Sequence, residues 1–140
     1  MIILRIMVAA LLGALLGYER EHLGKEAGLR THVLVTVGSA LFTSLSLFGF
    51  DGTHAAFDPS RIASQIVIGI GFVGGGVLIH QRQRVQGLTT AAELWVAAAI
   101  GMAMGVGWYA IAIFTTFLVF LVLSAQKLSH PDNGKSKSKV

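Results

Sequence analysis

Five apolar runs, each about long enough to cross a membrane as a helix, constrain this chain more than any other feature. They lie at about 2–18, 31–50, 62–80, 91–106 and 108–125, and a helix needs about 20 residues to cross a hydrocarbon core of about 30 Å. Only 13% of the 140 residues are charged, about half the share found in ordinary soluble domains. The sequence therefore predicts an all-α, polytopic membrane protein with five transmembrane helices.

The first run and the last segment set the limits of the expected membrane domain. Arg5 is the only early charge and no small-residue cleavage site follows, so we expect the first run to stay in the mature protein rather than act as a signal peptide. Arg5 itself is expected to reach the outer headgroups and to make no other contact. The sequence predicts a five-helix domain over residues 1–126 and a polar, basic, disordered tail over 127–140.

The basic residues lie on one side of the expected helices. Nine of the eleven Lys and Arg residues fall in the connection between the first two runs, in the connection between the third and fourth, or after the fifth. By the positive-inside rule this side is the cytoplasm, so the N-terminus is expected outside and the C-terminus in the cytoplasm. The basic residues therefore indicate how the helices are oriented in the membrane, which is expected to be the inner (plasma) membrane. The lipid bilayer is the expected partner, and nucleic acid is not.

The third run contains Gly69, Gly71 and Gly74 in the spacing G-x-G-x-x-G, which also occurs in dinucleotide-binding folds. Such a site needs a strand before the glycines and a helix that opens after them. Here the glycines lie inside an unbroken apolar run that begins after Asp58 and Pro59, residues typical of a helix start. We therefore interpret them as helix-packing residues, and a nucleotide-binding enzyme is the weakest hypothesis.

Small residues at G-x-x-x-G spacing let membrane helices approach closely. Three pairs occur: Gly13 with Gly17, Gly71 with Gly75, and Gly101 with Gly105. Gly69, Gly71, Gly74 and Gly75 are predicted to form a packing surface on the third helix. One such surface is expected to serve contact between copies of the chain, so a homo-oligomer is predicted, with a dimer favoured.

Polar residues near membrane depth need a partner, an interface or a function. Arg61 and Gln65 lie one helical turn apart, with Gly69 on the same face; they either line a small aqueous pocket or serve as an interfacial anchor and an interhelical hydrogen bond. Glu93, expected in the first turn of the fourth helix, is favoured there by the helix dipole. It is expected to pair with Arg30, Arg82 or Arg84, or to bind a cation.

The densest polar cluster runs from residue 18 to residue 32, directly after the first helix. Two carboxylates of this cluster, Glu19 and Glu26, are together with Glu93 weak candidates for ligands of a hydrated Mg²⁺. The histidines form no zinc pattern, and no nucleophile elbow or lysine-bearing phosphate loop is present. No enzymatic activity, catalytic residue or firm cofactor is predicted; Mg²⁺ is the one cofactor retained.

Three blocks resemble the membrane domain of the MgtC/SapB family of bacterial inner-membrane proteins: "GALLGYEREHLGKEAGLRTHVLVTVGSALF", "RIASQIVIGIGFVGGGVLI" and "VQGLTTAAELWVAAAIGMAMGVGWY". They occur in the same order as in that family and cover most of the chain. The resemblance implies a polytopic protein associated with magnesium limitation and, in pathogens, with virulence. It singles out a functional cytoplasmic cluster of Glu19, Arg20, Gly28, Leu29, Arg30, Thr31, Gly87, Leu88, Thr89 and Thr90. It also singles out an intramembrane set of Arg61, Gln65, Gly69 and Gly71.

Two functions follow as hypotheses. The first is support of Mg²⁺ homeostasis, or of adaptation to low Mg²⁺, by regulating or assisting another membrane complex. The second is a small homo-oligomeric Mg²⁺ transporter or channel, with a path past Gln65 and the glycines of the third helix. Glu93 departs from the small or hydroxyl residue expected from the family, so it inherits no family role.

Overall fold

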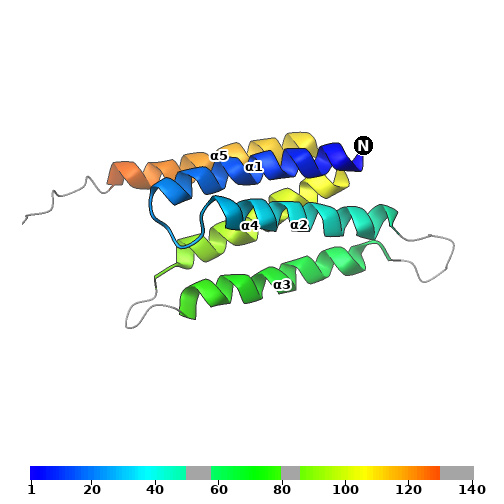
Figure 1. The fold of residues 1–140 in the computed structure, drawn as a ribbon, viewed down its shortest axis with the longest axis horizontal. Coiled ribbons are helices and arrows are strands. Elements are labelled where there is room, and N and C mark those ends of the chain that lie inside the picture. Colours follow the sequence, from blue (N-terminus) through cyan, green and yellow to red (C-terminus); the bar gives the residue numbers. More distant parts are fainter. Residues whose placement is uncertain (50–57, 80–85, 130–140) are drawn as a thin grey trace, which may run out of the picture.

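The computed structural model describes residues 1–49, 58–79 and 86–129, and within them the chain forms five α-helices joined in an up-and-down order (Figure 1). The helices are α1 (Ile2–His22), α2 (Leu29–Phe48), α3 (Ser60–Ile79), α4 (Leu88–Val106) and α5 (Tyr109–Ser129). Helices α1 and α3 pack against opposite sides of the central pair α2 and α4, and α5 packs against α4 and α1. The predicted all-helical fold is confirmed.

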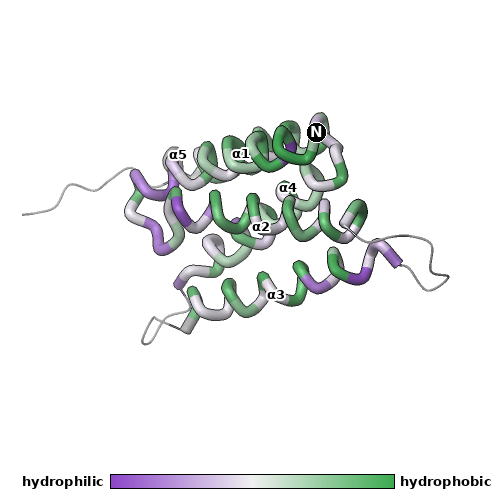
Figure 2. Tube along the Cα trace, turned by 45° about the vertical axis from the view of Figure 1, so that its right-hand side comes forward, coloured by the Kyte–Doolittle hydropathy of each residue, from purple (hydrophilic) through white to green (hydrophobic). Residues whose placement is uncertain are grey.

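Four helices, α1 to α4, are long and apolar enough to cross a membrane. The apolar part of α5, Tyr109–Ala125, is shorter, so a fifth span stays a prediction. Apolar residues follow the length of the helices, and polar ones gather in the α1–α2 connection and at the start of α3 (Figure 2). Residues 127–129 of the tail predicted over 127–140 belong to α5, and the rest of that tail lies outside the described residues, as do Arg82 and Arg84.

Helix α2 has an inverted polarity that suits a membrane bundle. Its buried residues are nearly all polar or small, whereas Leu34, Phe42 and Phe48 are exposed. Thr36 shows how the buried hydroxyls are satisfied: its Oγ1 donates to the carbonyl oxygens of His32 and Val33, at 3.0 and 3.1 Å. The face of α2 that points into the bundle therefore consists of small, mostly polar side chains, and its large apolar side chains face outward, where lipid replaces water.

Glycines bring α1 and α4 close to α2, as their G-x-x-x-G spacing predicts. A Cβ on Gly17 would lie 2.6 Å from the Cα of Leu29, and one on Gly105 would lie 2.7 Å from the carbonyl oxygen of Ala40. Gly13 and Gly101 are equally close to Thr36. No side chain fits at these four positions, so α2 is held between two helices by close backbone contact.

The start of α3 is capped as the pair Asp58 and Pro59 predicts. The Asp58 carboxylate accepts hydrogen bonds from the backbone N–H and the hydroxyl of Ser60, at 2.9 and 2.7 Å. These two bonds favour the charged carboxylate and lower the pKa of Asp58 below its ordinary value of 3.8. The side chain of Ser46 in α2 donates to the Pro59 carbonyl oxygen, which ties the start of α3 to the end of α2.

Arg5 makes internal contacts, and the prediction that it only reaches the outer headgroups is wrong. Its Nη1 donates to the Gly105 carbonyl oxygen at 2.7 Å, and its guanidinium lies 5.1 Å from the ring centre of Phe48. Gly107 ends α4 in a left-handed conformation, with φ +98°, and a Cβ there would lie 2.8 Å from Nη2 of Arg5. An unsatisfied helix-terminal carbonyl at membrane depth is costly, and it attracts this cation inward.

Replacing Arg5 with methionine should therefore lower the free energy of unfolding by about 1.5–3 kcal/mol, the usual contribution of a hydrogen bond to a charged group. Thermal unfolding of the purified protein in detergent measures this change. Arg61→Met is the matched control, because Arg61 is exposed, and it should change the free energy by less than about 0.5 kcal/mol. Equal effects of the two substitutions would contradict the role given to Arg5.

Candidate functional site

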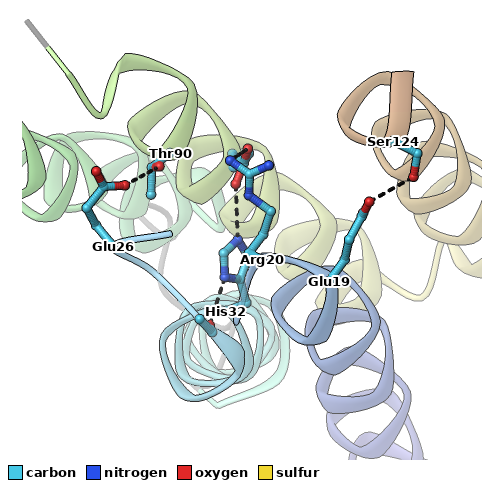
Figure 3. A network of polar contacts seen from close by, with 8 residues as sticks. Glu19, Arg20, Glu26, His32, Thr90 and Ser124 are labelled. Carbon is cyan, nitrogen blue, oxygen red and sulfur yellow. Dashed lines mark hydrogen bonds and ion pairs between the residues drawn. The ribbon is translucent and has the colours of Figure 1, made fainter. Parts of the chain in front are cut away.

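An ion pair joins α1 to α4 at the end of the bundle that carries the α1–α2 connection. Nη2 of Arg20, in the last turn of α1, lies 2.8 Å from Oε1 of Glu93 in α4. The two side chains are 1% and 3% exposed. Figure 3 shows the Arg20 side chain extending away from α1 toward α4. Within the described residues the cation beside Glu93 is Arg20 and not the predicted Arg30, and the other predicted partners, Arg82 and Arg84, lie outside those residues.

His32 brings a third helix, α2, to this pair. Its Nδ1 donates to the Gly28 carbonyl oxygen at 3.0 Å, and its Nε2 lies 3.9 Å from Oε2 of Glu93. The ring is fully buried (Figure 3). Because Nδ1 carries the donated proton, Nε2 of the neutral ring faces the carboxylate with a lone pair. Arg20, His32 and Glu93 form what we call the buried triad.

The buried triad is only partly satisfied by the described chain. Nε and Nη1 of Arg20, Nε2 of His32 and both carboxylate oxygens of Glu93 have no hydrogen-bond partner there. The ion pair is thus close in distance but poorly aligned for hydrogen bonding. Buried polar atoms of this kind normally bind ordered water or another polar group, so the triad is a place where small polar molecules would be stabilised.

Two further carboxylates form cross-contacts around the triad (Figure 3). The Thr90 hydroxyl of α4 donates to Oε2 of Glu26 at 2.9 Å, and the Ser124 hydroxyl of α5 donates to Oε1 of Glu19 at 2.8 Å. A backbone hydrogen bond, together with the Thr90 hydroxyl, lowers the pKa of Glu26 below its ordinary value of 4.5. Each of the two carboxylates binds a different helix.

The α1–α2 connection is itself fixed by a carboxylate. Oε2 of Glu21 accepts the backbone N–H of Leu29 at 2.8 Å, which caps the start of α2. A Cβ on Gly28 would lie 2.9 Å from the same oxygen, so the glycine leaves room for the cap. Arg30 is exposed and Thr31 is partly exposed on the first turn of α2. The Glu21 side chain thus ties the end of α1 to the start of α2, beside the exposed charge of Arg30.

The predicted Mg²⁺ ligands do not converge in the described part of the chain. Glu19, Glu26 and Glu93 contact Ser124, Thr90 and Arg20 respectively. Within residues 1–49, 58–79 and 86–129, no group of three His, Asp or Glu side chains has the arrangement of a metal site. These residues do not fit a resident Mg²⁺ of that kind.

The structure brings Arg20, from the first half of the predicted cytoplasmic cluster, to the second half, Gly87, Leu88, Thr89 and Thr90. A pocket of about 390 Å³ lies between the α1–α2 connection and the start of α4. Gly87 precedes α4 in a left-handed conformation, with φ +85°, which turns the chain into the helix beside this pocket. The lining residues are Arg20, Lys25, Glu26, Gln86, Gly87, Leu88, Thr89 and Thr90. We call this the loop pocket.

The predicted packing glycines of α3 are placed differently from those of α1 and α4. Gly74 lies against Ala91: a Cβ on Gly74 would be 3.5 Å from the Cβ of Ala91. At Gly69, Gly71 and Gly75 a Cβ would meet no atom within 4 Å. The described helices of this chain therefore do not pack closely against these three glycines. Their use as a packing surface for another molecule stays a prediction.

Gln65 lies on a groove between α2 and α3. The groove has a volume of about 360 Å³ and includes Ser39 and Gly69, with apolar side chains making up most of its wall. Gln65 and Arg61 are both exposed, and Arg61 is not among the residues that line the groove. The structure thus places Gln65 beside Gly69, as the helical spacing predicts, on a largely apolar surface.

The sequence did not predict that His32 would lie beside Glu93 or that Ser124 would bind Glu19 at this end of the bundle. One signal was available for the ion pair: a carboxylate inside an apolar run needs a cation at the same depth, and Arg20 ends the first apolar run. No comparable signal marks Ser124, because a serine in an apolar helix can hydrogen-bond to its own backbone.

The helices are long and apolar, and they bury polar side chains that contact one another at one end of the bundle. These features define a multi-pass α-helical membrane protein. The MgtC family model matches residues 6–130, and the chain belongs to this family.

Three relatives illustrate the relationship. "Putative magnesium transporter YhiD" of Escherichia coli (strain K12) is 48% identical over 125 residues, 86% of this chain and 58% of the relative. Protein MgtC of Salmonella typhimurium (strain LT2) is 44% identical over 117 residues, 84% of this chain and 48% of the relative. Protein slr0014 of Synechocystis sp. is 43% identical over 119 residues, 85% of this chain and 49% of the relative.

The chain thus spans about half the length of the curated relatives it matches. No solved structure matches it.

Proposed function

We propose that this membrane protein supports Mg²⁺ homeostasis by acting on another complex of the inner membrane. Membership of the MgtC family and the magnesium in a relative's name support the link to Mg²⁺. The observation that carries the regulatory role is the use of the carboxylates: Glu19, Glu26 and Glu93 bind other helices. Groups committed to cross-helix contacts stabilise a surface, whereas a transported ion needs ligands that can exchange.

The proposed working surface consists of two exposed residues, Arg30 on the first turn of α2 and Leu88, which lines the loop pocket at the start of α4. Leu88 is 58% exposed, and Arg30 is of a residue type that is enriched in protein interfaces. In this proposal the N-terminus is outside, α5 is the fifth span, and the surface faces the cytoplasm. The basic residues of the connections support this orientation.

We include a homodimer in the proposal. The open space at Gly69, Gly71 and Gly75 supports it, because small residues on an uncovered face of a membrane helix allow close approach of a second helix.

Site-specific photo-crosslinking in cells grown in low Mg²⁺ tests the regulatory role. A crosslinking residue at position 30 or 88 should capture one defined membrane protein, and the same residue at Arg61, on the first turn of α3, should not. Arg30→Glu should lose the crosslink at position 88 and reduce growth in low Mg²⁺. Normal growth of Arg30→Glu, with no heterologous crosslink from either position, would contradict the proposal.

A small cation transporter is the second candidate, and the groove between α2 and α3 is the observation that favours it. Gln65 and Ser39 bring polar atoms to this groove beside Gly69. Purified protein in liposomes would then conduct Mg²⁺, and Gln65→Leu would abolish the flux. We expect no Mg²⁺ flux above that of empty liposomes. A flux that disappears in Gln65→Leu would favour the transporter over the regulator.

A further inference from the structure

The loop pocket combines three features that suit a negatively charged ligand. It lies at the N-terminus of α4, a helix of 19 residues. It includes Lys25 and the hydroxyl-bearing Thr89, both exposed. It also includes Arg20, which is 1% exposed and has Nε and Nη1 without a hydrogen-bond partner in the described chain. A cation buried in this way does not belong to an ordinary solvated surface.

The N-terminus of α4 supplies donors to this pocket. Gly87 precedes the helix and brings no side-chain cap. The first backbone N–H of the helix that bonds to the preceding turn is that of Ala91, which donates to the Gly87 carbonyl oxygen at 2.8 Å. The preceding N–H groups of a helix point outward along its axis and carry its positive dipole. Such groups bind phosphate in many folds, above all beside basic side chains.

Glu26 sets the charge that the pocket accepts. Its carboxylate also lines the pocket and is held by the Thr90 hydroxyl. The charge of Arg20 is already balanced by Glu93 at 2.8 Å. Lys25 and the helix terminus therefore provide the net attraction, Nε and Nη1 of Arg20 provide unused donors, and Glu26 opposes a ligand with two negative charges. A phosphodiester, which carries a single charge, fits this balance better than a phosphomonoester.

We propose that the loop pocket binds a phosphodiester group. Two sources share this chemistry: the headgroup of an anionic phospholipid and a soluble phosphodiester. The pocket lies where the apolar helix α4 begins, at the depth of lipid headgroups, so the phospholipid is the expected source. The inference does not depend on a protein partner, because binding is measured on the isolated chain.

The test is titration calorimetry on the full chain in uncharged detergent. Dioctanoyl phosphatidylglycerol represents the lipid, glycerophosphoglycerol the free diester with the same headgroup, and glycerol phosphate the monoester. We expect the lipid to bind, the free diester to compete with it, and glycerol phosphate to bind more weakly than the free diester. Competition with stronger binding of the free diester than of the lipid would support the site with a soluble ligand.

Lys25→Gln should weaken binding of the lipid about fivefold, the effect of one lysine charge close to a phosphate-bearing surface. Thr89→Val should weaken it further in the double variant. Both residues are exposed, so the variants keep the fold. Arg61→Gln removes the same charge from another surface and should leave the affinity unchanged. Absence of binding, or an equal loss in Lys25→Gln and Arg61→Gln, would overturn the proposal.

Discussion

Glu93→Ala should lower the free energy of unfolding by about 3–5 kcal/mol, because it leaves Arg20 buried and without its counter-charge. Arg20 is 1% exposed, so water screens its charge very little. In a low-dielectric environment an unpaired cation is far more costly than a pair. Thermal or denaturant unfolding in detergent micelles, followed by the helical circular dichroism signal, measures the loss.

The double variant Arg20→Met/Glu93→Leu provides the control for this prediction. It removes both charges and fills the same space with apolar side chains, so it should recover most of the stability that the single variant loses. If the double variant were as unstable as the sum of Arg20→Met and Glu93→Leu measured singly, the two residues would act independently. That result would contradict the ion pair.

Gly101→Ala should lower the free energy of unfolding by about 1–3 kcal/mol, the usual cost of an extra methyl group in a packed interior. A Cβ at this position would overlap the Thr36 carbonyl oxygen and lie 2.8 Å from the Cβ of Ser39. Backbone atoms of α2 cannot move aside as a flexible side chain can. Either α2 and α4 separate or the helix bends, and both disrupt the contact between the central helices.

Gly71→Ala is the matched control, since the same methyl group would meet no atom within 4 Å. It should be neutral or slightly stabilising to the isolated chain, because alanine loses less backbone entropy in a helix than glycine does. The free energies of unfolding of Gly101→Ala and Gly71→Ala, measured side by side in detergent, test this difference. Equal destabilisation by Gly71→Ala in dilute detergent would contradict the open surface seen on α3.

The sequence predicted the helices well because membrane helices have a simple physical signal. The apolar run at 91–106 and the helix α4 differ only at the N-terminal end, where the structure extends to Leu88. The difference arises because Leu88, Thr89 and Thr90 form the first turn beside the polar loop pocket, whereas hydropathy marks only the part inside the hydrocarbon. Glu93 accordingly lies in the second turn of α4.

The pairing of glycines with neighbours was harder to predict. Gly13 with Gly17 and Gly71 with Gly75 have identical spacing, yet the first pair meets α2 and the second meets no described residue. Spacing places two glycines on one face of a helix but carries no information about which face points inward. The partner of Glu93 was missed for a related reason: Arg20 and Arg30 both lie in the polar segment between the first two apolar runs, and only the packing of α1 on α4 selects Arg20.

The structure also changes what the polar cluster of the first loop implies. Arg20, one of its most prominent charges, is buried and joins helices, whereas Arg30 and Lys25 are exposed. We therefore infer that the charged loop has two layers, an inner one that stabilises the bundle and an outer one that meets other molecules. A substitution in the inner layer acts on folding, and one in the outer layer acts on binding.

Growth in low Mg²⁺ of a strain that carries only the Arg20→Met/Glu93→Leu variant tests the central claim most directly. Our account holds that Glu93 serves the fold through Arg20 and does not bind a transported ion. It predicts that the double variant, once its insertion and amount in the membrane match those of the wild type, supports normal growth. A variant that is inserted and stable but fails to support growth would contradict the account.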